Sequence, residues 1–196
     1  MTDLITLRRQ LRHARRSLSE RERLDAAAAA LASIQKLSRY ARAHCIALYI
    51  GADGELCPLP LADQAWAQGK TICLPVLHPF SAGRLMFCTW KTGERLQTNR
   101  FGILEPIPNA RNLVSPRQLD LVITPLLGFD EHGHRLGMGG GYYDRTFAVR
   151  RRHRRIHRPF MLGLAHEQQK ISRLEPQPWD VPLDAVVTNV KTYLFG

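Results

Sequence analysis

The sequence has no hydrophobic run long enough to cross a membrane. A transmembrane helix needs roughly 18 or more consecutive apolar residues, and no segment of this chain comes near that length. The first residues, MTDLITLRRQLRHARR, carry arginines but no apolar segment with a cleavage site behind it. We therefore expect neither a membrane span nor a secretion signal, and we predict a cytoplasmic protein.

Cysteine is scarce as well. The 4 cysteines are Cys45, Cys57, Cys73 and Cys88, and no C-x-x-C pair occurs among them. Cys45 and Cys73 lie in apolar, strand-like runs, where a thiol usually behaves as a small buried hydrophobic group. We expect free thiols rather than disulfides or a zinc site. The absence of a G-x-S-x-G motif also disfavours a serine hydrolase.

Acidic residues are outnumbered. The chain has 28 Lys and Arg against 17 Asp and Glu, which gives a formal net charge of +11. Such a field attracts nucleic acid, anionic lipid or a small substrate with phosphates or carboxylates, and charge alone does not choose among them. The densest basic run is RRRHRRIHR at 150–158. It is either a solvated helix end or loop, or a rim that attracts anions.

The 196 residues suit one domain, which we assign to 1–196. Apolar periodicity predicts helices at 3–16, 20–38, 58–69 and 141–152. Apolar runs predict buried strands at 45–50, 71–76, 119–124, 159–165 and 184–188, and a further strand at 84–90 that we place at an edge. Alternating strands and helices predict a single-domain, three-layer α/β/α fold with a mostly parallel, Rossmann-like sheet and basic N-terminal helices.

A glycine-rich segment between 119–124 and 141–152 carries the densest functional signal. Gly137, Gly139, Gly140 and Gly141 lead directly into the predicted helix. Glycine lets the backbone approach a ligand closely, and free N–H groups at a helix start bind phosphate. Arg135 and Arg145 flank the segment and can pair with phosphate oxygens, while Asp144 can hold magnesium. The segment is neither a dinucleotide-binding G-x-G-x-x-G nor a P-loop. The alternative is a flexible loop with a glycine-rich helix cap.

The chain resembles the 5-formyltetrahydrofolate cyclo-ligase family over nearly its whole length. The resemblance is carried by LDLVITP at 119–125, Gly128-Phe129-Asp130, RLGMGGGYYD at 135–144, Gly54-Glu55-Leu56, LPV at 74–76, NRFGILEP at 99–106 and WDVPLDAVVT at 179–188. It implies an ATP- and magnesium-dependent conversion of 5-formyltetrahydrofolate to 5,10-methenyltetrahydrofolate, with release of ADP and phosphate. In the implied reaction the formyl oxygen attacks the γ-phosphate, N10 closes on the activated carbon, and phosphate departs.

The resemblance also implies roles for individual residues. Catalysis falls to Arg135, Arg145 and Asp144, and magnesium to Asp144 and Asp180. The implied ATP-binding residues are Arg8, Arg135, Leu136, Gly137, Met138, Gly139, Gly140, Gly141, Tyr142 and Tyr143. The implied folate-binding residues are Ile50, Glu55, Phe101, Met138, Gly139, Gly140, Gly141 and Tyr142.

Three positions, one in the N-terminal helix and two in the glycine loop, depart from the family pattern. Leu4 stands where many members have a lysine, and Met138 and Gly140 stand where many have arginine and lysine. Phosphate contacts must then rest on backbone N–H groups, on Arg135 and Arg145, and on arginines from elsewhere.

Several of these residues also have ordinary structural interpretations. Asp180 can be a turn former, Phe101 a core residue, and Tyr142 and Tyr143 anchors of the helix. Arg12, Arg15 and Arg16 can form a solvated helix face, and His132 and His134 a solvated turn. His166 follows strand 159–165, where ligands gather in open α/β folds.

Two other functions compete with the cyclo-ligase. A nucleic-acid-binding protein would use the basic run and the N-terminal helix, but the sequence contains no known nucleic-acid-binding motif. A family paralogue would keep the fold and act on another formylated or carboxylated compound. We expect ATP and a folate with one or more glutamates as ligands, no nucleic acid or membrane partner, and a monomer.

Overall fold

A large mixed sheet forms the centre of the computed structural model, which describes residues 3–152 and 158–195. The strand order in the sheet is β12-β11-β10-β7-β1-β2-β3-β6. Its strands are β1 (Cys45–Ala47), β2 (Thr71–Leu77), β3 (Leu85–Thr89), β6 (Leu113–Val114), β7 (Leu121–Thr124), β10 (Phe160–Ala165), β11 (Ala185–Thr188) and β12 (Thr192–Leu194). The central pairs from β11 to β2 are parallel, and the pairs at both edges are antiparallel.

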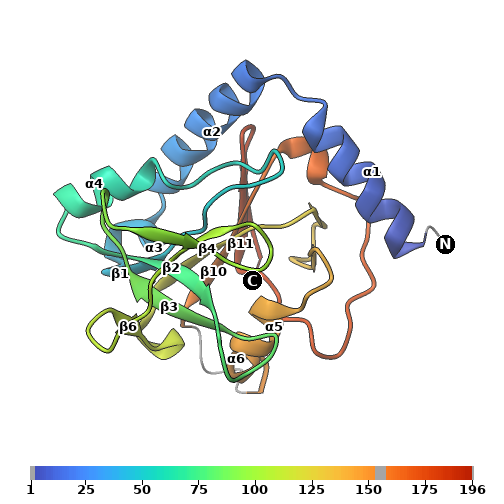
Figure 1. Cartoon of the computed structure of the whole chain (residues 1–196). Coiled ribbons are helices and arrows are strands. Elements are labelled where there is room, and N and C mark those ends of the chain that lie inside the picture. Colours follow the sequence, from blue (N-terminus) through green and yellow to red (C-terminus); the bar gives the residue numbers. More distant parts are fainter. Residues whose placement is uncertain (1–2, 153–157, 196) are drawn as a thin grey trace.

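Helices and loops cover both faces of this sheet (Figure 1). One face carries α2 (Glu20–Gln35), α3 (Ser38–Arg42) and α4 (Leu61–Ala67), and the other carries α5 (Tyr142–Thr146) and α6 (Ala148–Arg152). The helix α1 (Leu4–Arg16) lies beyond the end of α2. The predicted three-layer, mostly parallel α/β fold is therefore confirmed. Of the two N-terminal helices predicted to be basic, α1 is, whereas α2 carries Glu20, Glu22 and Asp25 against Arg21 and Arg23.

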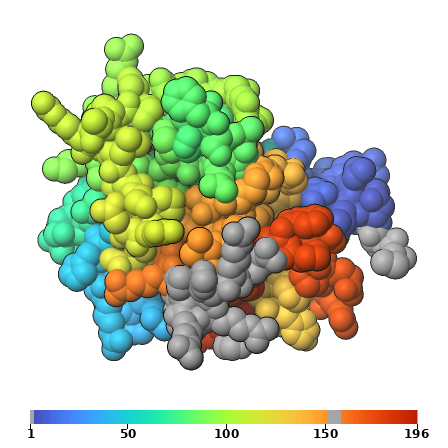
Figure 2. All heavy atoms as spheres, turned by 90° about the horizontal axis from the view of Figure 1, so that it is seen from below, coloured from blue at the N-terminus to red at the C-terminus, as the bar shows by residue number. Residues whose placement is uncertain are grey.

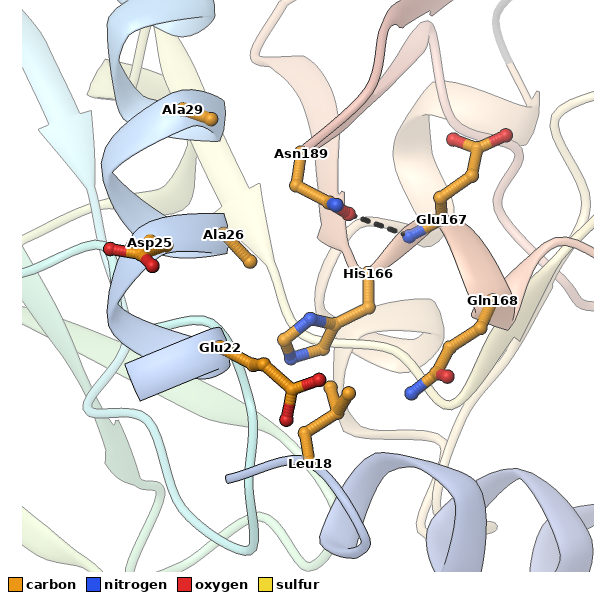
Figure 3. Close-up of a pocket in the computed structure, with 9 residues that line it drawn as sticks. All are labelled: Leu18, Glu22, Asp25, Ala26, Ala29, His166, Glu167, Gln168 and Asn189. Carbon is orange, nitrogen blue, oxygen red and sulfur yellow. Dashed lines mark hydrogen bonds between the residues drawn. The ribbon is translucent and has the colours of Figure 1, made fainter. Parts of the chain in front are cut away.

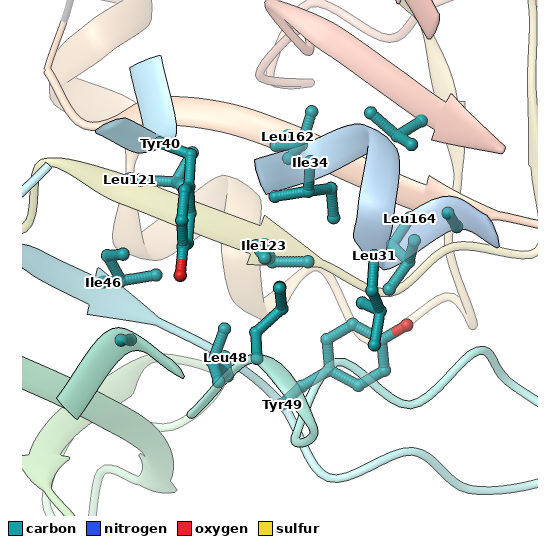
Figure 4. Close-up of a cluster of buried hydrophobic side chains, with 14 of the residues drawn as sticks. Leu31, Ile34, Tyr40, Ile46, Leu48, Tyr49, Leu121, Ile123, Leu162 and Leu164 are labelled. Atoms are coloured by element: carbon teal, nitrogen blue, oxygen red, sulfur yellow. The ribbon is translucent and has the colours of Figure 1, made fainter. Parts of the chain in front are cut away.

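Alternation along the central strands explains the two covered faces. In β7, Leu121 and Ile123 pack into the larger hydrophobic cluster and Val122 into the cluster on the opposite face. The larger cluster joins Leu31 and Ile34 of α2 to the strands (Figure 4). A strand with both faces buried must be apolar throughout, which is why 119–124 and 159–165 were recognisable in the sequence.

The two N-terminal helices separate at Ser17–Ser19 for a local reason. Ser19 and Glu22 form a capping box, in which each side chain accepts a hydrogen bond from the other residue's backbone N–H. Within 20–38, however, α2 ends at Gln35 and a separate short helix, α3, follows. The buried Lys70 Nζ donates to the carbonyls of Tyr40, Ala41 and Ala43, which satisfies the end of α3.

Several predicted boundaries were wrong. The helix predicted at 141–152 is divided at Phe147 into α5 and α6. The strand predicted at 45–50 is regular only over Cys45–Ala47, and the helix at 58–69 only over Leu61–Ala67. The strand that we predicted at the sheet edge, β3, lies between β2 and β6. A further strand, β12, follows β11, which we predicted to be the last strand.

Short strands escaped the sequence analysis altogether. Two small hairpins lie outside the main sheet: β4 (Leu96–Thr98) with β5 (Leu104–Pro106), and β8 (Gly128–Phe129) with β9 (Arg135–Leu136). Short 3-10 turns occur at Pro116–Gln118 and at Glu167–Gln169, the latter labelled η2.

The cysteines agree with the sequence analysis. All four are free, and Cys73 and Cys88 are buried. Cys45 and Cys73 face each other on neighbouring strands, with their sulfurs 3.7 Å apart. No helix in the described residues combines the length and the hydrophobicity that crossing a bilayer requires.

The parallel strands bring three predicted segments to one edge of the sheet. The carboxyl ends of β1, β7 and β10 lead into the 48–57 segment, the glycine loop and His166, respectively. Ligands in open α/β folds bind at this edge. Figure 2, which views the molecule from below, shows α5 (orange) at the surface between the green strands and the red-orange C-terminal segment.

Candidate functional site

The glycine loop 137–141 presents free backbone N–H groups. Gly139 and Gly141 have φ values of 96° and 59°, which L side chains rarely adopt. Within the described residues, no backbone N–H from Met138 to Asp144 donates a hydrogen bond to the protein. A row of unpaired amides on an exposed loop is an anion-binding arrangement. Because α5 is only five residues long, its dipole adds less than the predicted long helix would.

Arg135 and Asp144 brace the loop from behind. Arg135 Nη2 lies 2.5 Å from Asp144 Oδ1, and Nη1 lies 2.5 Å from the carbonyl oxygen of Val181. The N–H of Val181 donates to the same Asp144 oxygen at 3.0 Å. The Arg135 side chain is 6% exposed. Its guanidinium is therefore engaged with protein groups, and it joins the loop to the 180–183 segment.

Arg145 also donates hydrogen bonds to backbone carbonyls that hold the loop in place. Its Nε donates to the carbonyl of Gly83 at 2.9 Å, and its Nη2 donates to the carbonyl of Gly140. The two arginines that the sequence analysis predicted for phosphate thus also fix the shape of the loop.

The helix α1 lies against the loop and adds cationic groups. Arg8 Nε donates to the Gly137 carbonyl at 3.0 Å, and Arg12 Nη2 lies 3.4 Å from the Met138 sulfur. Leu11 packs with the buried Leu136 and with Leu174, which secures the helix beside the loop. The structure therefore brings the predicted Arg8, Leu136 and Gly137 together.

Glu55 lies in a turn that α1 also contacts. The fully buried Arg15 donates to the Asp53 carbonyl at 2.8 Å and pairs with Asp53 Oδ2 at 3.0 Å and Glu55 Oε1 at 3.3 Å. Burial raises the pKa of Glu55, and the positive charge of Arg15 opposes that rise. The interpretation of Arg15 as part of a solvated face was wrong, because this side chain is an internal tie.

Phe101 and Tyr142 form an aromatic contact at the mouth of the loop. Their rings meet edge to face with centroids 5.9 Å apart, and Arg100 Nη2 donates to the Tyr142 hydroxyl at 2.9 Å. Phe101 is 55% exposed, so the alternative of a core residue was wrong. Ile50, by contrast, is half-buried against the larger core cluster.

Tyr143 anchors α5. Its ring stacks on Phe147 with centroids 6.3 Å apart, and burial raises the pKa of its hydroxyl well above the ordinary value. These contacts agree with the interpretation of Tyr143 as an anchor of the helix.

Asp180 lies one residue before Val181, which Asp144 contacts. Asp180 Oδ2 accepts a hydrogen bond from the Gln177 N–H at 2.8 Å, so the side chain stabilises a turn, as the structural interpretation predicted. One oxygen of each carboxylate remains without a hydrogen bond in the described residues. No cluster of three or more His, Cys, Asp or Glu suited to a metal occurs there. Two carboxylates with open oxygens suit a magnesium ion, which keeps several waters, better than zinc.

The histidines have structural partners. His134 Nδ1 lies 2.9 Å from Oδ2 of the buried Asp130, so it is not simply a solvated turn residue, whereas His132 is exposed. His166 is 3% exposed, its Nε2 lies 3.2 Å from the Gly54 carbonyl, and burial lowers its pKa.

A cavity of about 510 Å³ lies beside His166, between α2 and η2 (Figure 3). Glu22 and Asp25 line one wall, and Glu167 and Asn189 line the other. None of the predicted ATP- or folate-binding residues lines it. The predicted site is instead the exposed surface formed by the loop, α1 and the Asp53–Glu55 turn.

The fold and this surface define a doubly wound α/β protein with an exposed glycine loop, rich in unpaired backbone amides, at the carboxyl edge of its parallel strands. The sequence model of the 5-formyltetrahydrofolate cyclo-ligase family matches residues 2–189 of this chain. The chain belongs to this family of ligases.

Relatives and solved structures agree with that membership. The 5-formyltetrahydrofolate cyclo-ligase of Escherichia coli is 39% identical over 93% of this chain and 98% of its own length. The enzyme of the same name from Haemophilus influenzae is 37% identical over 90% and 92%. The structure of Aquifex aeolicus 5,10-methenyltetrahydrofolate synthetase matches with a TM-score of 0.79 and 28% identity, over 97% of this chain and 92% of that one.

Sequence reasoning missed three groups that shape the site. Arg15 lies four residues after Leu11, at a position where the apolar stripe of α1 would continue. This spacing is the sequence feature that could have predicted its burial. Asp53 has a positive φ of 54° and gathers Arg12, Arg15 and Arg16. The contact of Val181 with Asp144 has no local signal, because 37 residues separate the two.

Proposed function

We propose that this protein converts 5-formyltetrahydrofolate to 5,10-methenyltetrahydrofolate with ATP and magnesium, releasing ADP and phosphate, in folate one-carbon metabolism. The observation that carries the proposal is the convergence of two segments on α1. One is a loop with free amides beside Arg8, and the other is the turn that holds the largely buried carboxylate of Glu55. The family membership supplies the chemistry that suits both.

The reaction has a balanced course in which the protein supplies position and charge. The formyl oxygen bonds to the γ-phosphorus of ATP, the bond to the β–γ bridging oxygen breaks, and its electron pair leaves with ADP. N10 of the folate then bonds to the formyl carbon of this phosphorylated intermediate, and the carbon–oxygen bond breaks to release phosphate. The proton that N10 loses leaves with the phosphate. Phosphoryl transfer of this kind depends on positioning and electrostatic stabilisation.

The phosphates lie on the amides of 138–141, with Arg8 beside them. Arg135 and Arg145 hold the loop in shape and add positive charge. Magnesium bound by the open oxygens of Asp144 and Asp180 would neutralise charge on the phosphates.

The pterin ring takes the other side of the surface. Glu55 accepts hydrogen bonds from the 2-amino and N3–H edge of the ring, as a carboxylate can accept two at once. Phe101 and Tyr142 flank the folate, and Ile50 supports it from the core. We also propose that the protein acts as a cytoplasmic monomer, and that its positive field attracts the glutamate tail.

The test follows methenyl product by its ultraviolet absorbance with purified protein, magnesium-ATP and 5-formyltetrahydrofolate. Asp180→Asn removes one carboxylate charge without touching Arg135, and we expect it to raise the magnesium concentration needed for half-maximal rate at least tenfold. Asp144→Asn should lower kcat by about 100-fold or more, because it also loosens Arg135. Asp63→Asn, on the exposed first turn of α4, is the matched control and should leave both quantities unchanged.

Three results would contradict the proposal in different ways. Wild-type protein that forms no product refutes the reaction. Product without ATP refutes the phosphorylated intermediate. Normal magnesium dependence in both Asp144→Asn and Asp180→Asn refutes the metal assignment alone. Salt-sensitive RNA binding by a protein that forms no product would favour the nucleic-acid alternative.

A further inference from the structure

Arg12 spans the gap between the two halves of the candidate site. Its Nε lies 3.4 Å from Asp53 Oδ2, in the turn that precedes Glu55. Its Nη2 lies 3.4 Å from the sulfur of Met138, in the glycine loop. Among the described residues, no other side chain makes a polar contact with both segments.

The guanidinium of Arg12 differs from its neighbours in how little the protein satisfies it. Arg15, Arg135 and Arg145 each donate to carbonyl or carboxylate oxygens through at least two nitrogens. Arg12 Nε is buried with no hydrogen-bond partner, and Nη2 faces a thioether, which is a weak acceptor. The side chain is 36% exposed, so its remaining donors are open to a ligand.

We propose that Arg12 is a catalytic residue whose guanidinium donates hydrogen bonds to the phosphoryl group during its transfer. This role rests on the proposed function. In that function the formyl oxygen and the γ-phosphorus must meet where the Asp53–Glu55 turn, which binds the pterin, adjoins the glycine loop, which binds the phosphates. Arg12 occupies that junction.

The physical reason is electrostatic. Negative charge spreads over the equatorial phosphoryl oxygens in the transition state, and a planar guanidinium binds two such oxygens at once. Asp53 holds Arg12 in place from one side, so little reorganisation accompanies the reaction. The weak sulfur contact fixes the position of the guanidinium without using up its donors. Arg12 takes up and releases no proton in this step.

The test compares Arg12→Ala and Arg12→Lys with Arg9→Ala, which removes an exposed arginine from the same helix. We expect Arg12→Ala to lower kcat by about 100-fold or more, with the KM for 5-formyltetrahydrofolate changed less than about threefold. Arg12→Lys should retain only part of the rate, because an ammonium lacks the planar fork. Added guanidinium ion should restore part of the rate of Arg12→Ala, and Arg9→Ala should behave as wild type.

A second readout does not depend on turnover. Calorimetric titration of wild type and Arg12→Lys with ADP and inorganic phosphate should show weaker phosphate binding in the variant, at least tenfold, with ADP binding nearly unchanged. If Arg12→Ala does not fold, Arg12→Lys decides by these two measurements, since it keeps the charge and the aliphatic stem.

The outcomes separate the two proposals. Wild-type protein without turnover overturns the function and this role together. Active wild type with an unchanged kcat in folded Arg12→Ala overturns the role alone. A loss confined to KM, or a loss that guanidinium ion does not rescue and that tracks a lowered melting temperature, shows that Arg12 is structural and also overturns it.

Discussion

Arg12 and Arg15 lie within one turn of each other on α1, yet their surroundings are opposite. Arg15 is fully buried, with its donors on Asp53 and Glu55, whereas Arg12 keeps open donors at the surface. The buried side chain ties α1 to the turn, and the open one faces the space between the turn and the glycine loop. One helix thus supplies both a structural tie and a group for chemistry.

Replacing Arg15 by methionine should destabilise the protein by about 3–5 kcal/mol, because the Asp53 and Glu55 carboxylates lose their buried partner. Urea denaturation at pH 7 measures the change. Arg16→Met removes a neighbouring Asp53 partner that is 62% exposed and should cost less than about 1 kcal/mol. Equal losses in the two variants would show that the burial of Arg15 has no special effect.

At this scale the sequence predicted the residues of the candidate site but not the contacts among them. The glycine loop, Asp144 and Glu55 stood out through composition and family resemblance. Arg15 did not, since a helical pattern in an arginine-rich segment does not reveal which arginine faces a carboxylate 38 residues away. The positions of Arg135 and Arg145 against backbone carbonyls likewise depend on tertiary contacts that no local pattern encodes.

The β8–β9 hairpin places Arg135, and one aspartate holds the hairpin. Asp130 is fully buried, and its Oδ1 accepts the N–H groups of His132 and His134, each at 3.0 Å. Its Oδ2 accepts the N–H of Leu174 at 3.0 Å and lies 2.9 Å from His134 Nδ1. Burial alone would raise the pKa of Asp130, but these hydrogen bonds outweigh it and the pKa is lowered.

Asp130→Asn should therefore destabilise the protein by about 1–3 kcal/mol at pH 7, because an amide cannot accept at both ends. A carboxyl whose folded pKa is lowered stabilises the fold above its unfolded pKa, and that stability is lost as the pH falls through the folded value. The difference between wild type and variant should shrink in acid. Urea denaturation at pH 7 and at about pH 3 measures it, with the exposed Glu131→Gln as control. A difference that does not change with pH would contradict the assignment.

Among the elements, long apolar ones were predicted well and short ones were not. The helix predicted at 141–152 is interrupted at Phe147, whose backbone leaves the helical region (φ −104°, ψ 18°). Beside the interruption, Thr146 Oγ1 donates to the Tyr142 carbonyl and accepts the N–H of Leu85 on β3, contacts that no local pattern encodes. Strands of two or three residues such as β8 and β9 are too short to show an alternating pattern. Their pairing is imposed by the turn at Asp130.

The net charge of +11 is a property of the whole molecule, and we expect it to make substrate binding depend on salt concentration. Anionic substrates are attracted over a distance set by the ionic strength, about 10 Å at 0.1 M and 3 Å at 1 M. The KM for ATP should rise several-fold when sodium chloride is raised from about 0.05 to 0.5 M, while kcat changes little. Steady-state kinetics at constant free magnesium measure this. A KM independent of salt would show that local contacts alone govern binding.

The fold class followed from the sequence because buried parallel strands are apolar on both faces. The order of the strands did not, since nothing local specifies that β7 pairs with β1 on one side and with β10 on the other. The arginine run at 150–158 lies partly outside the described residues. Within them, Arg150 pairs with Asp184 and Arg158 with Asp120.

The strand order also determines when each part of the chain can reach its final neighbours. The pairing of Ile46 with Leu121 requires all the residues between them to have been synthesised. α1 contacts η2, and α2 packs on β11, so both helices wait for segments near the end of the chain. Contacts so distant in sequence slow folding. On the ribosome, α1 and α2 therefore emerge long before η2 and β11, and part of their apolar faces stays uncovered until those later segments have been made.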